Sequence, residues 1–346
     1  FASYTQSSVH LYRGGQNLSA RVLVYLMSRF LVRRLFSMFI SIIGATIFIF
    51  ALTRVGPDPR YLYIPETGGI GIQEDLWEEL GEQLGINDPL PVQYGKWVWR
   101  MLQGDMGESI GTLRPVSSII WQHLPATLWL ALGAWIFAAV VGLTMGILAS
   151  VKRATIWDYL ARAFALVGQA TPQFFTGVLA IMIFSVYMGW FPAGTRGNHD
   201  GFFLAWGNLK FYILPWMVLG WPAAAGIMRL TRSSMLEILD SEYIKLARAK
   251  GVARLPLIWK HGLKNAIIPP LTSMLVLLAD YLNGALVVEI VFSWPGIGQV
   301  ALNQAVYDND WPLLVGTVFS FIGIYVSFAF IADLLYAFID PRIRYS

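Results

Sequence analysis

The chain has 346 residues, of which 56% are hydrophobic and 13% are charged, and its formal net charge is +4. Soluble domains carry about 25% charged residues, so this composition indicates that lipid surrounds much of the chain. The absence of cysteine excludes disulfides, thiolate metal sites and thiol nucleophiles, and the four histidines form no HxxxH or HExxH pair.

Six segments are apolar over the roughly 20 residues that a helix needs to cross a bilayer. They predict an all-α, polytopic membrane protein with six transmembrane helices, at residues 35–53, 126–150, 161–190, 211–230, 266–291 and 313–338. The third region is too long for a single crossing at about 1.5 Å per residue. We therefore expect Pro172 to break it, with a cytoplasmic helix leading into the span.

Lysine and arginine residues gather before the first span, after the second, between the fourth and fifth, and after the sixth. Because basic loops stay in the cytoplasm, this pattern predicts that both the N and C termini are cytoplasmic. The remaining segments are then a cytoplasmic N-terminal segment at 1–34, an external loop at 54–125, a cytoplasmic region at 231–265, an external turn at 292–312 and a cytoplasmic tail at 339–346.

The external loop contains two amphipathic patterns. QEDLWEELGEQLG places Leu76, Leu80 and Leu84 on one helical face. VQYGKWVWRMLQ carries Trp97 and Trp99, which suit a membrane interface. We expect two short helices that cap the outer mouth or contact an external partner, and an ordinary packed external loop is an equal alternative.

The stretch SEYIKLARAKGVARLPLIWKHGLKN, at residues 241–265, is the most basic part of the chain. Glu242 and Lys245 are spaced to pair on a helix. Gly251 suits a helix C-terminus, where the left-handed conformation is needed, and Pro256 suits the first turn of the next helix. The predicted structure is a helix, a sharp turn and a second helix between the fourth and fifth spans.

Apolar residues run through this basic hairpin, and we expect Val252, Leu255, Leu257 and Trp259 to be exposed. An exposed apolar patch rimmed by charge marks a partner site, so the hairpin is interpreted as a docking element for a cytoplasmic protein. The alternative is an amphipathic helix that lies on the inner leaflet.

Several polar residues lie at membrane depth. Asp280 is in the middle of the fifth predicted span, where a lone carboxylate costs about 2.5 kcal/mol or more, and Asn283 follows it. A contact for a substrate amine or the channel wall is one interpretation, and a structural partner on another span is the alternative. Three polar residues lie beside the proline break: Gln169, Thr171 and Gln173. They could line the transport pathway, but we favour the alternative that they satisfy the backbone carbonyls freed by Pro172.

EYIKLARAKG, followed by HGLKNAIIPP, resembles the cytoplasmic loop of binding-protein-dependent ABC importer permeases, in their dipeptide, oligopeptide and nickel branch. The wider family has Glu-Ala-Ala, three residues, Gly, nine residues and Ile-x-Leu-Pro. Gly251 fits this pattern, but Lys245 stands where the Glu would be, and His261 and Lys264 stand where the Ile and Pro would be. ARAKG and a basic residue with His before LxNA are typical of the branch.

Other landmarks extend the resemblance over residues 29–346, as one permease domain. They are QLGINDPLPVQYGKWVWRMLQGDMGES in the external loop, LPATLWLAL at the second span, GWFPAGT after the third, VVEIVFSWPGIGQVALNQAV after the fifth and DLLYAFIDPRIRYS at the C-terminus. No single landmark is specific, but their combination is.

The resemblance implies a type I ABC importer-like permease in a bacterial or archaeal plasma (inner) membrane. Its implied partners are a second permease, forming a heterodimer, two cytoplasmic ATPase subunits that hold ATP and Mg, an external substrate-binding protein and membrane lipid. The chain itself would be no enzyme and would hold no cofactor, metal or nucleic acid, and it has no GxxxxGK[ST] motif.

The same resemblance assigns region 231–265 to coupling with an ATPase subunit. The expected contact residues are Lys250, Gly251, Val252, Ala253, Arg254 and Leu255. Glu289 resembles a carboxylate usual in the family and is a further pathway candidate. The expected cargo is peptide.

Three alternatives to a peptide permease stay open. The same machinery could import nickel, glutathione or an oligosaccharide, because the external binding protein selects the cargo first. An ion-coupled secondary transporter is more distant, since the sequence has no inverted repeat with matching broken helices. A membrane-embedded enzyme lacks support from a His/Glu metal cluster or a G-x-S-x-G motif.

Overall fold

The structure is a computed structural model of the chain and describes residues 32–54, 60, 74–83, 87–197 and 206–339. Over these ranges the chain is almost entirely helical and forms no named strand. Most of the predicted terminal segments and Leu84 lie outside the described residues.

Four helices are long and apolar enough to cross a membrane within the described ranges. They are Val32–Arg54, Val116–Val151 (α4), Gly207–Leu239 within α7 (Trp206–Leu239), and Trp311–Leu335 within α13 (Trp311–Ile339). They overlap the first, second, fourth and sixth predicted spans, which identifies a polytopic all-α membrane protein.

The third predicted region is divided at Pro172, as expected. Helix α5 (Ile156–Ala170) and helix α6 (Gln173–Ala180), with its π-helical continuation Ile181–Tyr187, are bent by 113° at the break. Thr171 is extended, with ψ 132°, because the ring of a following proline disfavours the helical conformation. Among the described residues there are four candidate membrane spans, or five if α5 and α6 with its continuation are counted together as one broken span.

The fifth predicted region forms helix α11 (Ile268–Val291), of 24 residues. At about 1.5 Å per residue, this length suffices for a hydrocarbon core of roughly 30 Å. The described side chains give an apolar run of Ile268–Leu278, and those of residues 279 and 282–284 lie outside the description.

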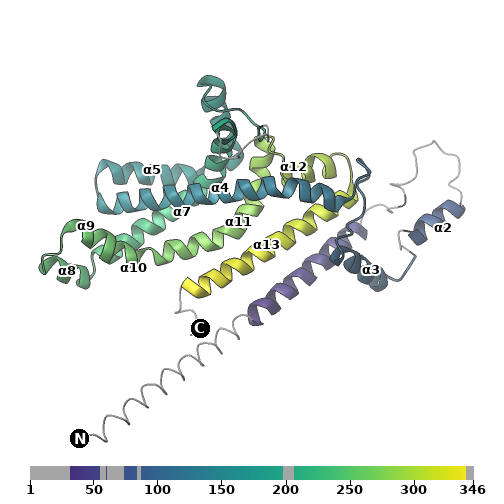
Figure 1. Cartoon of the computed structure of the whole chain (residues 1–346), viewed down its shortest axis with the longest axis horizontal. Coiled ribbons are helices and arrows are strands. Elements are labelled where there is room, and N and C mark those ends of the chain that lie inside the picture. The colour runs from purple at the N-terminus through teal and green to yellow at the C-terminus, as the bar shows by residue number, and fades with distance from the viewer. Residues whose placement is uncertain (1–31, 55–59, 61–73, 84–86, 198–205, 340–346) are drawn as a thin grey trace, which may run out of the picture.

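Helices α4, α5 and α7 run side by side, and α11 crosses beside α4 and α7 (Figure 1). Glycines on α4 allow a close approach to α7. A Cβ atom at Gly142 would lie 2.8 Å from the Ala224 carbonyl oxygen, and one at Gly146 would lie 2.7 Å from the Met228 carbonyl oxygen. Small residues at such crossings let helices associate through van der Waals contact where lipid removes the hydrophobic driving force.

The helix Val32–Arg54 lies beside α13 (Figure 1). Arg34 Nη2 and Asp333 Oδ1 form an ion pair of 3.2 Å between the two helices. Both amphipathic helices predicted in the external loop are present, as α2 (Glu74–Gln83) and α3 (Leu90–Leu102). Trp97 of α3 contacts Phe319 of α13 with ring centroids 6.3 Å apart, so α3 packs on the spans rather than standing apart.

The hairpin between α7 and α11 consists of α8 (Glu242–Ala249), α9 (Arg254–Pro256), the π-helical segment Leu257–Leu263 and α10 (Lys264–Ala266). At the opposite end of the bundle, α12 (Ile297–Val300) and the π-helical segment Ala301–Val306 lead into α13 (Figure 1).

Two predicted boundaries differ from the structure. Helix α4 begins ten residues before the predicted span and contains Pro125, and α7 contains Pro215 and Pro222 and ends at Leu239, inside the predicted coupling region. Prolines are tolerated within membrane helices because neighbouring groups satisfy the freed carbonyls. The first part of region 231–265 is therefore a continuation of α7.

Candidate functional site

The turn after α8 forms as the sequence predicts. Gly251 has φ 83°, in the left-handed region that glycine enters without steric cost. Its N–H donates to the Arg248 carbonyl at 3.0 Å, and the Val252 N–H donates to the Ala247 carbonyl at 3.2 Å. These two bonds are the Schellman arrangement that ends a helix sharply, and they fix the direction in which the chain leaves α8.

Most of the predicted coupling residues lie at the surface of this turn. Lys250, Gly251, Ala253, Arg254 and Leu255 are exposed and Val252 is half-buried. Leu255 is 68% exposed and Trp259 is 56% exposed. The prediction that Leu257 is exposed is wrong, because its side chain is only 4% exposed. The remaining apolar patch with its basic rim has the character of a protein-docking surface.

The hairpin is tied together by polar contacts. Glu242 Oε1 and Lys245 Nζ pair at 2.8 Å, as expected from their spacing. The Tyr243 hydroxyl donates to the His261 carbonyl at 3.2 Å and accepts a bond from Asn265 Nδ2 at 3.0 Å. The first helix of the hairpin is thus fastened to the second, which continues toward α11.

Apolar packing joins the hairpin to the ends of the spans. Ile258 and Ala266 are buried against Met235 of α7, with Val151 at the end of α4 packed beside them. On the same end of the bundle, Arg153 Nη1 and Asp240 Oδ2 pair at 3.3 Å. A displacement of the hairpin would therefore act on α4, α7 and α11 together.

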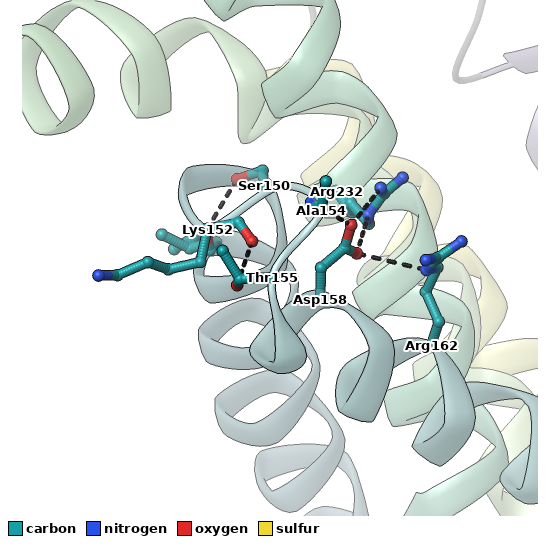
Figure 2. Close-up of polar contacts among 8 residues, drawn as sticks. Ser150, Lys152, Ala154, Thr155, Asp158, Arg162 and Arg232 are labelled. Atoms are coloured by element: carbon teal, nitrogen blue, oxygen red, sulfur yellow. Dashed lines mark hydrogen bonds and ion pairs between the residues drawn. The ribbon is translucent and has the colours of Figure 1, made fainter.

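A buried carboxylate near the hairpin was not singled out by the sequence. Asp158, at the start of α5, receives bonds from Arg232 of α7 at 2.8 Å (Nε to Oδ1) and 2.9 Å (Nη2 to Oδ2). Arg162 Nε lies 3.4 Å from Oδ1, and the Ala154 N–H donates to Oδ2 at 3.0 Å. Figure 2 shows the two arginines and the loop backbone converging on this carboxylate.

The cluster fixes the loop between α4 and α5. Ala154 has φ 60°, a left-handed conformation that side chains other than glycine rarely adopt, and its N–H is the one held by Asp158. The Thr155 hydroxyl donates to the Lys152 carbonyl at 2.6 Å in the same loop (Figure 2). The only signal in the sequence was the i,i+4 spacing of Asp158 and Arg162, because Arg232 is 74 residues away.

Two predicted pathway residues are brought together. Asp280 of α11 and Gln173 of α6 line one groove, whose other walls come from α7. The side chain of Asn283 lies outside the described part of α11.

Gln169 and Thr171 stand at the break between α5 and α6. The Thr171 hydroxyl donates to the Val167 carbonyl at 2.7 Å, which also accepts the Thr171 backbone N–H at 3.1 Å, so this bond does not replace the N–H that Pro172 lacks. Gln169 is exposed, and its Nε2 would lie 3.5 Å from a Cβ atom at Gly226 of α7. Gln169 therefore faces α7 rather than the groove.

Glu289 is enclosed by the turn after α11 rather than facing open space. It is 0% exposed; its Oε1 accepts a bond from the Thr127 hydroxyl at 2.7 Å, and its Oε2 accepts one from the Gln299 N–H at 3.1 Å. A Cβ atom at Gly296 would fall on this carboxylate. In this chain, Glu289 anchors the turn after α11 to α4.

A second carboxylate holds the end of the bundle opposite the hairpin. Asp310 Oδ2 accepts bonds from the Ser109 hydroxyl at 2.5 Å and the Gly111 N–H at 3.2 Å, and Oδ1 accepts one from the Leu313 N–H at 3.1 Å. It caps α13 and joins it to the segment between α3 and α4. Among the described residues, no three His, Asp or Glu side chains come together as a metal site would require.

Comparison with known proteins places these features in a family. Residues 142–345 match the family described as binding-protein-dependent transport system inner membrane component, and residues 27–131 match its N-terminal component. The chain is 37% identical over 324 residues to the oligopeptide transport system permease protein AppB of Bacillus subtilis (strain 168), covering 92% of this chain and 100% of the relative.

The dipeptide transport system permease protein DppB of Escherichia coli (strain K12) is 35% identical over 341 residues, covering 92% of this chain and 99% of the relative. A solved structure of the MetNI methionine ABC transporter in an inward-facing conformation has a similar fold, with a TM-score of 0.51 and 21% identity. The aligned region covers 64% of this chain and 96% of the methionine transporter chain. The chain therefore belongs to the family of binding-protein-dependent transport system inner membrane components, and it is a multi-pass membrane protein.

Proposed function

We propose that this chain is one of two permease subunits of an ATP-driven importer, and that the pair forms a pathway for peptides delivered by an external binding protein. Separate cytoplasmic ATPase subunits supply the energy, with ATP and Mg bound there. The observation that carries the proposal is the exposed basic and apolar turn Lys250–Leu255, in a hairpin that packs against the ends of α4 and α7 and continues into α11.

The topology that fits this function has six spans, both termini in the cytoplasm, and a bacterial or archaeal plasma (inner) membrane around it. The basic residues of the α4–α5 loop and of the hairpin lie at one end, since Arg153 pairs with Asp240. The acidic anchors Glu289 and Asp310 lie at the other, beside the external loop. Positively charged loops favour the cytoplasmic side.

In the proposed mechanism, closure of the ATPase pair moves the hairpin as a rigid body. Two observations support a rigid lever: the Schellman turn at Gly251 and the clamp of Tyr243 on Asn265 and the His261 carbonyl. The Asp158–Arg232 pair passes the motion of α7 to α5. Switching of this kind requires that the ATPase contact the hairpin differently in its two states.

Peptide is the cargo that the named relatives support, since both are described as peptide permeases. Nickel, glutathione and oligosaccharide are the other outcomes of a cargo test. An ion-coupled secondary transporter would move its substrate without the ATPase subunits, which the same experiment detects.

The test is reconstitution of this chain in proteoliposomes with its second permease, its ATPase subunits and the binding protein. We expect uptake of a labelled dipeptide that requires both ATP and the binding protein. Uptake under an ion gradient without ATPase subunits would contradict the proposal.

Charge reversal at the hairpin tests the lever itself. Arg254→Glu alters an exposed residue of the proposed ATPase contact, so we expect ATP hydrolysis to become uncoupled from uptake. Arg114→Glu, at an exposed residue of the external segment before α4, is the matched control and should leave the coupling ratio unchanged. Normal coupling in Arg254→Glu would remove the assignment of this contact.

A further inference from the structure

A groove of about 270 Å³ lies between α6, α7 and α11. Its apolar wall consists of Leu219, Pro222, Ala223 and Leu277, and its polar wall consists of Gln173, Asp280 and Tyr281. The polar residues come from two elements that are far apart in the sequence and meet beside α7. Asp280 is in the middle of α11, so the groove lies at the depth of the bilayer core.

The polar groups of the groove have no partner in the described protein. The Tyr281 side chain is 5% exposed, and its hydroxyl is buried without a hydrogen bond. Asp280 is exposed to the groove, and it forms no ion pair with any described residue. A buried hydroxyl left unpaired costs about 1–3 kcal/mol, and an intramembrane carboxylate costs at least as much.

Structural carboxylates elsewhere in the chain behave differently. Asp158 pairs with Arg232, and Glu289 and Asp310 accept two or more hydrogen bonds each. This groove combines a carboxylate and a buried hydroxyl that are both unpaired in the described residues. Polar groups arranged in this way suit a ligand that supplies the missing partners.

The chemistry of the walls selects the ligand. A carboxylate accepts charge-assisted bonds from an ammonium group, and a tyrosine hydroxyl or a glutamine amide donates to a carbonyl oxygen. An ammonium and a carbonyl stand next to each other at the amino end of a peptide. A cavity of about 270 Å³ is smaller than the roughly 300–1,000 Å³ of sites that enclose a whole drug-sized ligand, so it suits one end of a peptide.

We propose that this groove is a subsite on the transport pathway, in which Asp280 binds the α-ammonium group of the peptide and Tyr281 and Gln173 bind its first carbonyl group. The inference rests on the proposed function of the chain as a peptide permease. It assigns Asp280 a role in binding and leaves Glu289 a structural anchor.

The experiment uses the complete transporter in proteoliposomes, with radiolabelled dialanine as the probe and dialanine imported per ATP hydrolysed as the readout. Tyr281→Phe removes a hydroxyl that has no protein partner, so the permease should unfold at the same temperature or higher. Its yield of dialanine per ATP should nevertheless fall about threefold to tenfold, as expected for one neutral hydrogen bond to the ligand.

Asp280→Asn removes the charge and should lower the yield about tenfold or more, since charge-assisted bonds are roughly twice as strong as neutral ones. Asp280→Glu restores the charge and should recover part of the yield. Tyr325→Phe is the matched control, because Tyr325 lines a different groove with apolar residues only, and its yield should equal that of the unmodified protein.

Three outcomes would overturn the inference. Wild-type yields in both Asp280→Asn and Tyr281→Phe would exclude the groove from the pathway. Dissociation of the permease pair by Asp280→Asn would identify a basic group of the second permease as the partner of Asp280. If the unmodified transporter shows no ATP hydrolysis in response to peptide-loaded binding protein, the proposed function itself fails, and the subsite with it.

Discussion

Asp158 provides the sharpest test of how the hairpin end of the bundle is held together. Its side chain is 2% exposed and its partner Arg232 is 23% exposed, whereas Arg153 and Asp240 form a pair whose side chains are 60% and 71% exposed. The same substitution, Asp to Asn, can therefore be made in a buried pair and in an exposed pair at the same end of the bundle.

The expected magnitudes differ because of burial. Removing one member of a buried ion pair costs about 3–5 kcal/mol, and the partial exposure of Arg232 places Asp158→Asn near the lower end of that range. With an unfolding entropy of about 2 cal/mol/K per residue, this free energy lowers the unfolding midpoint of a 346-residue chain by roughly 4 °C. An exposed pair contributes about 0–1 kcal/mol, so Asp240→Asn should shift the midpoint by roughly 1 °C or less.

The assay is thermal unfolding of the purified permease in one detergent and buffer, followed by intrinsic fluorescence. The double variant Asp158→Asn/Arg232→Gln should cost less than the sum of its single variants, because it leaves no buried charge unpaired. Equal shifts for Asp158→Asn and Asp240→Asn, or strict additivity in the double variant, would refute the reasoning.

Two glycines offer further predictions. Gly296→Ala should destabilise the turn after α11, because its Cβ atom would fall on the carboxylate of Glu289. Gly323→Ala is the control: its Cβ atom meets no atom within 4 Å, so it should be neutral in the same unfolding assay. Comparable shifts of the unfolding midpoint for both variants would contradict this prediction. Gly146→Val should separate α4 from α7, since even a Cβ atom would lie 2.7 Å from the Met228 carbonyl oxygen. The yield of folded permease in gel filtration should therefore fall. A wild-type yield would contradict the close approach of the two helices.

The helices, turns and helix break that could be predicted from the sequence are those that depend on local sequence patterns. Apolar length predicted the regions that form the span helices, the glycine and proline of the hairpin predicted its turns, and Pro172 predicted the break before α6. These features depend on residues within a few positions of one another, where backbone sterics and helix periodicity act.

The contacts that organise the site were not predicted, because they join distant parts of the chain. Arg232 is 74 residues from Asp158, and Thr127 is 162 residues from Glu289. The exposure of Leu257 was predicted wrongly, because burial in the hairpin depends on tertiary packing: the adjacent Ile258 is buried against Met235 of α7. Asp280 and Gln173 were singled out separately in the sequence, but only the fold shows that they line one groove.

The most direct measurement of the central claim is site-specific cross-linking of the hairpin turn. The chain contains no cysteine, so Leu255→Cys can carry a single benzophenone label, and Val92→Cys on exposed α3 serves as the control. In the assembled transporter, the label at Leu255 should cross-link to an ATPase subunit and the label at Val92 should not. Attachment at Leu255 only to lipid, or no attachment to the ATPase, would contradict the claim that this turn is where ATP hydrolysis acts on the permease.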